Sequence, residues 1–171
     1  MEWRAISSAG EPSATITPAQ VAIGHIAWVT LKLTFTGAVF VAVAAPLGGA
    51  VGPGILGALA AAVLTGAAVT ALVTAYAAKV ELAQGFTVLF RLIVIPVTLF
   101  SGTFFPVEQL PAVVRPLAWI SPLWHGTELA RAAALDRWAL LPALGHLAFL
   151  GALLALGVGL SARLFTRRLA Q

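Results

Sequence analysis

Residues 33–78 read LTFTGAVFVAVAAPLGGAVGPGILGALAAAVLTGAAVTALVTAYAA and contain no formal charge over 46 positions. A single helix of that length would extend about 69 Å, more than twice the roughly 30 Å of a bilayer's hydrocarbon core. The run must therefore turn, and residues 46–54 (PLGGAVGPG) hold the prolines and glycines that break helices. The stretch predicts two membrane-spanning helices, roughly Trp28–Ala45 and Ile55–Ala77.

Two further apolar stretches follow. Leu82–Val107 contains one charged residue, Arg91, and Trp138–Ala162 contains none. Each is long enough to cross a bilayer, and backbone groups in lipid must be paired within the segment, which favours helices. We expect an all-α integral membrane protein, a single transmembrane domain over residues 1–171. It would have about four transmembrane helices, with short interfacial helices between the third and the fourth.

The composition excludes several classes of protein. Of the 171 residues, 60% are hydrophobic and only 9% are charged, whereas a soluble domain has about 25% charged residues. Neither an ordinary soluble enzyme nor a disordered chain fits these values. The chain has no cysteine, which excludes disulfides and cysteine-based zinc sites. The net charge of +4 would suggest nucleic acid in a soluble protein, but in a membrane protein cations mark the cytoplasmic face, so no nucleic-acid partner is expected.

The distribution of Lys and Arg predicts the orientation in the plasma or inner membrane. Four crossings put both termini on the same side, and that side carries six cations: Arg4, Lys79, Arg91, Arg163, Arg167 and Arg168. The other side carries three: Arg115, Arg131 and Arg137. We therefore expect both termini in the cytoplasm. Residues 1–27 would form a cytoplasmic or interfacial segment and residues 163–171 a basic cytoplasmic tail.

Residues 106–137 differ from the spans around them. Prolines at positions 106, 111, 116 and 122 interrupt any continuous helix. Trp119, Trp124 and Trp138 favour the headgroup region, where the ring is buried and its N–H stays hydrated. We expect an outer interfacial hairpin of short helices. It is either a loop anchored by its aromatic residues or a gate that contacts a substrate.

The sequence contains no motif for catalysis or nucleotide binding. It lacks the Gly-x-x-x-x-Gly-Lys-Ser/Thr phosphate loop and the Gly-x-Ser-x-Gly and His-Glu-x-x-His motifs. His125 and Glu128 are three residues apart, and we interpret them as a polar interfacial pair rather than a metal site. His146 is expected to form an interhelical hydrogen bond. We expect no catalytic, cofactor-binding or metal-binding residue in this chain.

Small residues recur every four positions in the last apolar stretch, at Gly151, Ala155 and Gly159. This spacing lets helix backbones approach closely, which stabilises helix association in lipid. We expect the stripe to be a packing surface, without knowing its partner.

Two segments resemble a known family. Residues 99–111 (LFSGTFFPVEQLP) end the third predicted span, and residues 120–131 (ISPLWHGTELAR) follow within the next segment. Together they resemble the carboxy-terminal part of type 2 ABC exporter permeases. The resemblance is strongest to the lipo-oligosaccharide (nodulation-type) branch, with antibiotic-resistance permeases nearby. A weaker likeness covers residues 16–21 (ITPAQV), which are similar to the family's cytoplasmic segment ahead of its third span.

The resemblance implies a membrane permease that moves an amphipathic substrate such as a lipid, a lipo-oligosaccharide or a drug. A separate cytoplasmic ABC ATPase subunit would bind ATP and Mg, and the permease would pair with a second copy or a sister permease in the lipid. The segment that couples to the ATPase would be Ile16, Thr17, Pro18, Ala19, Gln20 and Val21. The outer hairpin or gate would include Phe104, Phe105, Pro106, Glu108, Pro122, His125, Gly126 and Glu128.

The predicted number of spans departs from the family. Its permeases usually have six, so the four spans predicted here would correspond to the last four, and the first two are expected to be missing. The alternatives are a truncated permease fragment and a non-transporting membrane scaffold or assembly protein.

Overall fold

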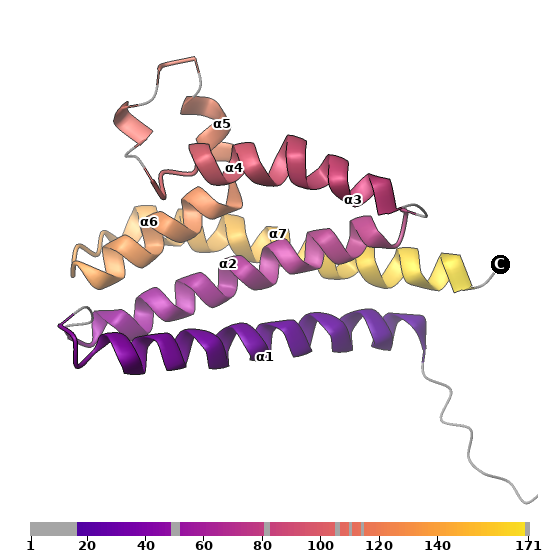
Figure 1. Ribbon diagram of the computed structural model, residues 1–171, viewed down its shortest axis with the longest axis horizontal. Coiled ribbons are helices and arrows are strands. Elements are labelled where there is room, and N and C mark those ends of the chain that lie inside the picture. Colours follow the sequence, from indigo (N-terminus) through magenta and orange to yellow (C-terminus); the bar gives the residue numbers. More distant parts are fainter. Residues whose placement is uncertain are drawn as a thin grey trace, which may run out of the picture.

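The computed structural model describes residues 17–48, 52–80, 83–104, 107–109, 111–113 and 115–169, and in these residues every regular element is a helix. This confirms the predicted all-α fold (Figure 1). The α-helices are α1 (Pro18–Ala44), α2 (Gly54–Ala77), α3 (Ala83–Leu89), α4 (Ile95–Phe100), α5 (Arg115–Ile120), α6 (Pro122–Ala134) and α7 (Leu140–Leu169). A π-helical turn, η1 (Phe90–Val94), joins α3 to α4, and a 3-10 turn, η2 (Val107–Gln109), lies between α4 and α5.

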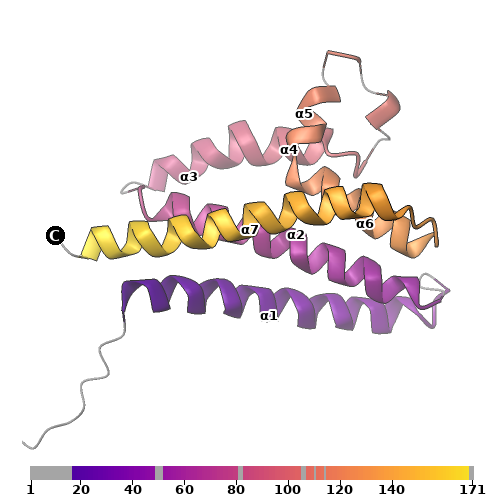
Figure 2. The same cartoon turned by 180° about the vertical axis from the view of Figure 1, so that it is seen from behind.

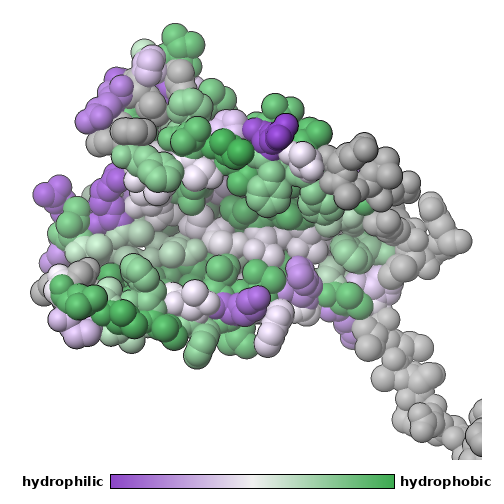
Figure 3. Space-filling model, in the orientation of Figure 1, coloured by the Kyte–Doolittle hydropathy of each residue, from purple (hydrophilic) through white to green (hydrophobic). Residues whose placement is uncertain are grey.

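Three helices are long and apolar enough to cross a membrane: α1, α2 and residues Leu140–Thr166 of α7. Their outward faces carry large apolar side chains, among them Trp28, Phe35 and Phe40 of α1, which are 60%, 71% and 71% exposed. Figure 3 shows apolar side chains over most of the visible face. Such a surface is stable against lipid and not against water.

Helix α1 begins ten residues before the predicted span. The hydroxyl of Thr17 accepts a hydrogen bond from the Gln20 N–H at 3.3 Å, and the Gln20 side chain accepts one from the Thr17 N–H at 2.8 Å. Pro18 occupies the first turn, where its missing N–H leaves no bond unmade. This capping box fixes the start of the helix. Residues 18–27, part of the segment expected to be cytoplasmic or interfacial, therefore form the first turns of the same helix as the first span.

Helices α1, α2 and α7 pack side by side (Figure 1, Figure 2). The buried face of α2 consists only of alanine and threonine: Ala61, Thr65, Ala67, Ala68, Ala71, Thr74 and Ala75. Gly157 of α7 lies so close to this face that an added Cβ would come within 2.7 Å of the Ala71 Cβ. The buried hydroxyl of Ser161 donates to the Ala71 carbonyl at 3.1 Å. Small residues thus bring the two backbones together, as expected in lipid.

The third apolar stretch forms a shorter helix than the predicted Leu82–Val107. Its apolar helical part is Gly85–Phe100, 16 residues. The π-helical turn η1 precedes Pro96, which has no N–H to donate and whose ring clashes with the preceding turn. The helix ends at Phe100 because Gly102 adopts a φ of 78°, a left-handed conformation that glycine tolerates. The predicted end at Val107 was wrong, and Val107 lies in η2.

The two ends of the bundle differ. The Pro18 end of α1 and the Leu169 end of α7 lie at one end (Figure 1). The connection from α1 to α2, the last turn of α6 and the start of α7 lie at the other (Figure 1). The start of α1 and the end of α7 therefore share one end of the bundle.

Candidate functional site in the hairpin between α4 and α7

Helix α6 lies along α2 and reaches the middle of the bundle. Ser121 caps its first turn by accepting a hydrogen bond from the Trp124 N–H at 3.4 Å. Near this end Gly126 touches the side chain of Thr65, the twelfth of the 24 residues of α2. At the other end Ala133 lies against Gly54, the first residue of α2. Because α2 is about 36 Å long, the hairpin extends from one end of the bundle to about half its depth.

Only glycine allows this approach. A Cβ at Gly126 would overlap the Oγ1, Cβ and Cγ2 atoms of Thr65. Thr65 is itself buried, and its hydroxyl donates to the Ala61 carbonyl of the same helix at 2.7 Å. The contact between α6 and α2 is thus backbone against side chain, with its polar atoms satisfied within α2.

Polar contacts join α6 to the end of α4. The Arg131 guanidinium bonds the Glu128 carboxylate at 2.7 Å and also donates to the carbonyl of Gly102 at 3.2 Å. The hydroxyls of Thr127 and Thr103 are 3.4 Å apart. These bonds bring together the two motif segments, residues 99–111 and 120–131, that the sequence analysis singled out.

The buried residue at this junction is Ser101, which has no solvent exposure. Its hydroxyl bonds the Thr98 carbonyl at 2.9 Å and the Thr103 hydroxyl at 2.8 Å. The Ser-Gly-Thr segment therefore folds into a fixed bend whose carbonyl at Gly102 is presented to Arg131. The arrangement holds the end of the third apolar helix on the hairpin.

A second set of contacts joins α6 to α7. The Nδ1 atoms of His125 and His146 are 2.7 Å apart, so His146 forms the interhelical hydrogen bond that the sequence predicted. The His125 ring stacks on Phe149, with centroids 3.9 Å apart and an interplanar angle of 18°. Burial lowers the pKa of His125 from its ordinary value of 6.5. The hydrogen bond to the Trp119 carbonyl opposes this shift, and the neighbouring His146 adds to it.

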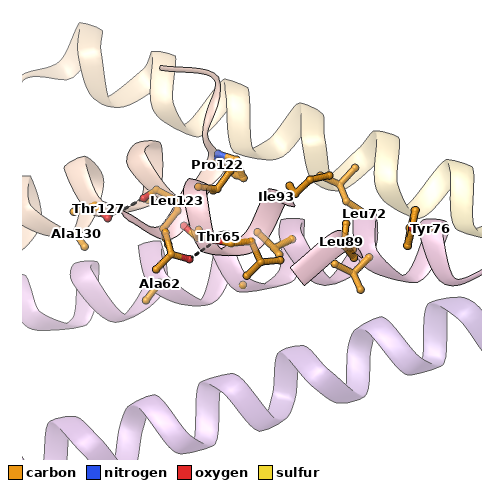
Figure 4. Close-up of a pocket in the computed structure, with 17 residues that line it drawn as sticks. Ala62, Thr65, Leu72, Tyr76, Leu89, Ile93, Pro122, Leu123, Thr127 and Ala130 are labelled. Atoms are coloured by element: carbon orange, nitrogen blue, oxygen red, sulfur yellow. Dashed lines mark hydrogen bonds between the residues drawn. The ribbon is translucent and has the colours of Figure 1, made fainter. Parts of the chain in front are cut away.

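An apolar groove lies between α2 and the short third helix (α3, η1 and α4), and α6 forms part of its wall. Its cavity volume is about 600 Å³, within the range of about 300–1,000 Å³ that is usual for small-molecule sites. The lining side chains include Leu72 of α2, Ile93 of η1 and Leu123 of α6 (Figure 4). Thr65 and Thr127 also line it, but both hydroxyls donate to carbonyls of their own helices. The groove suits hydrocarbon rather than a polar ligand.

The structure gathers part of the predicted gate. Pro122, His125, Gly126 and Glu128 all lie on α6 and take part in the contacts or the groove described above. Phe104 is instead 61% exposed. Glu108 lies in η2, where its backbone carbonyl accepts a hydrogen bond from Arg115 at 2.6 Å. Phe105 and Pro106 lie outside the described residues.

Several residues of the site were not predicted to belong to it, chiefly Ser101, Thr127 and Arg131. Thr127 and Arg131 stand one turn apart on the face of α6 that meets the bend after α4. The available signal was their position within the two motif segments. In the described part of the chain no cluster of three or more metal-ligating side chains occurs, and Glu128 pairs with Arg131 rather than with His125.

The predicted coupling segment lies at the start of α1. Thr17 and Gln20 form the capping box, Pro18 and Ala19 complete the first turn, and Val21 is 51% exposed. Ile16 lies outside the described residues. The segment is at the end of the bundle opposite the hairpin (Figure 1).

The predicted stripe on α7 does not pack within the described chain. A Cβ added at Gly151 or Gly159 meets no heavy atom within 4 Å, and Ala155 is exposed. The face of α7 that is buried carries Ala143, Leu150, Gly157 and Ser161 instead. Contact of the stripe with another chain stays a prediction.

Several curated proteins are similar in sequence to about two thirds of this chain. The protein is 35% identical over 122 residues to "Nodulation protein J" of Sinorhizobium fredii (strain NBRC 101917 / NGR234), covering 71% of this chain and 47% of that protein. It is 34% identical over 111 residues to the protein of the same name from Rhizobium leguminosarum bv. trifolii, covering 65% and 42%. With that of Rhizobium meliloti (strain 1021) the identity is 31% over 116 residues, covering 68% and 44%.

The chain spans about half the length of the curated relatives it matches. No solved structure matches it. The family model for ABC-2 type transporters matches residues 11–135, which include α1 to α6 and both motif segments. That match confirms the resemblance stated from the sequence and the expectation of a membrane transport subunit rather than an enzyme. With well over half of its residues covered, the chain belongs to the ABC-2 type transporter family.

Proposed function

We propose that this chain is a permease subunit of an ATP-driven exporter and moves an amphipathic substrate with a separate ATPase subunit. The observation that carries the proposal is the family match over residues 11–135, which includes the hairpin and the start of α1. The resemblance of the two motif segments to lipo-oligosaccharide (nodulation-type) exporter permeases favours a lipid-linked saccharide as the cargo class.

The groove supports an amphipathic cargo. It is apolar, and it lies between α2 and the short third helix, beside the hairpin. A hydrocarbon chain would be stabilised by binding in the groove, because its apolar surface would be removed from water. A saccharide head would stay outside, because the lining offers no free hydrogen-bonding group for it. The termini on the ATPase side would lie in the cytoplasm and the hairpin at the outer face.

Reconstitution tests the proposal. The protein is reconstituted in proteoliposomes with a candidate ABC ATPase subunit from the same organism, and ATP hydrolysis is measured with and without the permease. We expect the two to co-purify and the permease to stimulate hydrolysis further when a lipid-linked oligosaccharide is added. Binding without stimulation would favour the scaffold function, and absence of binding would contradict the proposal.

A matched pair of variants tests the coupling segment. Val21 and Val43 lie near opposite ends of α1 and are 51% and 59% exposed. If the start of α1 docks on the ATPase, Val21→Asp should lower stimulated ATPase activity by about tenfold or more, since one lost interface anchor costs roughly 1–2 kcal/mol. Val43→Asp should leave stimulation near the wild-type level. Equal effects of the two variants would contradict docking at this end.

A further inference from the structure

Two imidazoles meet between the hairpin and α7. The Nδ1 atoms of His125 and His146 are 2.7 Å apart, which is hydrogen-bond distance. The Nε2 atom of His125 lies 2.9 Å from the backbone carbonyl oxygen of Trp119 in α5. His125 is therefore bonded through both ring nitrogens, once to α7 and once to α5.

The carbonyl fixes where the protons lie. A carbonyl oxygen can only accept, so Nε2 of His125 must carry a hydrogen. The Nδ1 atom of a neutral His125 is then an acceptor, and the hydrogen between the rings must belong to Nδ1 of His146. The neutral pair has one arrangement: His146 donates to His125, and His125 donates to the Trp119 carbonyl.

This arrangement tolerates one added proton and not two. A first proton on Nε2 of His146 leaves its Nδ1–H donating as before. A second proton would have to bind Nδ1 of His125, the atom that accepts the bond. Two N–H groups would then face each other, and two like charges would be in contact. The bond between the rings would break.

We infer that His125 and His146 are positioning residues that hold the hairpin on α7 through the hydrogen bond between their rings. This bond persists when the pair binds one extra proton, and it breaks and releases the hairpin when the pair binds a second. Theirs is the one side-chain hydrogen bond between α6 and α7 among the residues that the structure describes. The rings are also shielded by Trp124, whose centroid is 4.8 Å from that of His125 and 5.1 Å from that of His146. Shielding from water strengthens both the bond and the repulsion that would break it.

Few other charges act on the pair. Glu128 lies on the same helix as His125, and its carboxylate already pairs with Arg131. Helix α5 contributes the Trp119 carbonyl and Arg115 at its far end. Helix α2 contributes no Asp, Glu, Lys, Arg or His, and on the facing part of α7 His146 is the only titratable side chain. The number of protons bound to the two rings therefore determines whether the hydrogen bond between them can form.

Histidine ¹⁵N NMR of the protein in lipid bilayers tests the inference, because ring nitrogens with and without hydrogen give distinct signals. The chain has three histidines, and His25, exposed on α1, serves as an internal reference. At alkaline pH we expect hydrogen on Nδ1 of His146 and on Nε2 of His125. On acidification the pair should take up its two protons in steps more than about one pH unit apart, as coupled groups do. Hydrogen on Nε2 of both rings at alkaline pH would overturn the inference.

Release is measured separately. The chain has no cysteine, so spin labels can be placed at Ala134→Cys and Leu144→Cys, on exposed positions of α6 and α7. The label distance should stay constant through the first proton uptake and broaden or lengthen at the second. An unchanged distance with both rings charged would overturn the inference.

Two variants separate the bond from mere packing. His146→Asn supplies an amide donor that does not titrate, and it should keep the hairpin docked at the pH where the wild type releases it. His146→Leu, which fills the space without a donor, should broaden the label distance at every pH. If His146→Leu fails to fold, the wild-type spectra and His146→Asn still decide the question. None of these measurements requires transport, so this inference and the proposed function can fail independently.

Discussion

At the scale of single residues, Gly126 sets how closely the hairpin approaches α2. A Cβ there would overlap the buried Thr65. We expect Gly126→Ala to destabilise the protein by about 1–3 kcal/mol, the usual cost of overpacking a filled site. Thermal unfolding in detergent or bilayers measures it.

Gly145→Ala is the control for that substitution. Gly145 lies on α7 with no heavy atom within 4 Å of an added Cβ. Alanine should therefore be neutral or stabilise the helix by up to about 1 kcal/mol. Equal behaviour of the two variants would mean that α6 does not lie against α2 as described.

The pKa of His125 predicts an acid-sensitive stability. Burial lowers its pKa in the folded protein below the ordinary value of 6.5 that applies after unfolding. Below about pH 6.5 the unfolded state therefore binds more protons than the folded state, and stability falls as the pH falls. We expect the unfolding temperature to be level above this window and to decrease below it.

Two variants control the acid effect. His125→Asn should weaken the dependence of the unfolding temperature on pH, because one of the two imidazoles of the pair is gone. His25→Asn, a histidine substitution on α1 outside the contact between α6 and α7, is the matched control. A steeper profile in His125→Asn than in the wild type would contradict the assignment.

At the scale of helices, α7 has two faces of small residues, and only one of them packs on another helix of the described chain. Gly157 packs on Ala71 of α2, while Gly151 and Gly159 meet nothing within 4 Å in the described chain. Gly157→Leu should disrupt the fold of the single chain by several kcal/mol, since a large side chain cannot fit at this backbone contact. The measurement is the yield and unfolding temperature of the purified protein.

The outer stripe of α7 gives the opposite expectation. Gly151→Leu and Gly159→Leu should leave the chain folded but weaken its association with a second permease chain, because small residues allow close packing of helices in lipid. Oligomeric state in bilayers, read by cross-linking or single-molecule photobleaching, measures the effect. Wild-type association in both variants would remove the stripe from the interface.

The three long helices were predictable from the sequence, because long uncharged apolar runs and a Pro-Gly turn between the first two mark them. The ten residues by which α1 extends ahead of the predicted span were not predicted to be helical, and the Thr17–Gln20 capping box begins the helix there. The prediction overran the third helix, because apolar residues continue past Gly102, where the backbone turns. Composition predicts which stretches are apolar, but capping residues and residues with positive φ determine where each helix begins and ends.

The candidate site was only partly predictable. The motif segments were recognised from sequence, and the residues on α6 are among them. The pairing of His125 with His146 was not predicted, because 21 residues separate them and spacing alone does not show which faces of α6 and α7 meet. The packing of Gly157 on α2 was not predicted for the same reason: both faces of α7 carry small residues, and spacing alone does not show which face meets α2.

At the scale of the whole molecule, the two segments to which the proposed function assigns roles lie at opposite ends of the bundle. The start of α1 and the end of α7 share one of them, and the hairpin occupies the other, dipping to the midpoint of α2. An exporter needs this separation, because ATP is hydrolysed on one side and the cargo leaves on the other. The proposed function therefore requires the two ends to face opposite sides of a membrane.

Cysteine labelling in intact cells tests that claim most directly, since the chain has no cysteine of its own. Single cysteines are placed at Val113, which is 88% exposed in the hairpin, and at Thr166, exposed near the end of α7. We predict that a membrane-impermeant thiol reagent labels Val113→Cys in intact cells and Thr166→Cys only after the membrane is opened. Labelling of both positions from the same side, or of Thr166→Cys alone in intact cells, would contradict the account.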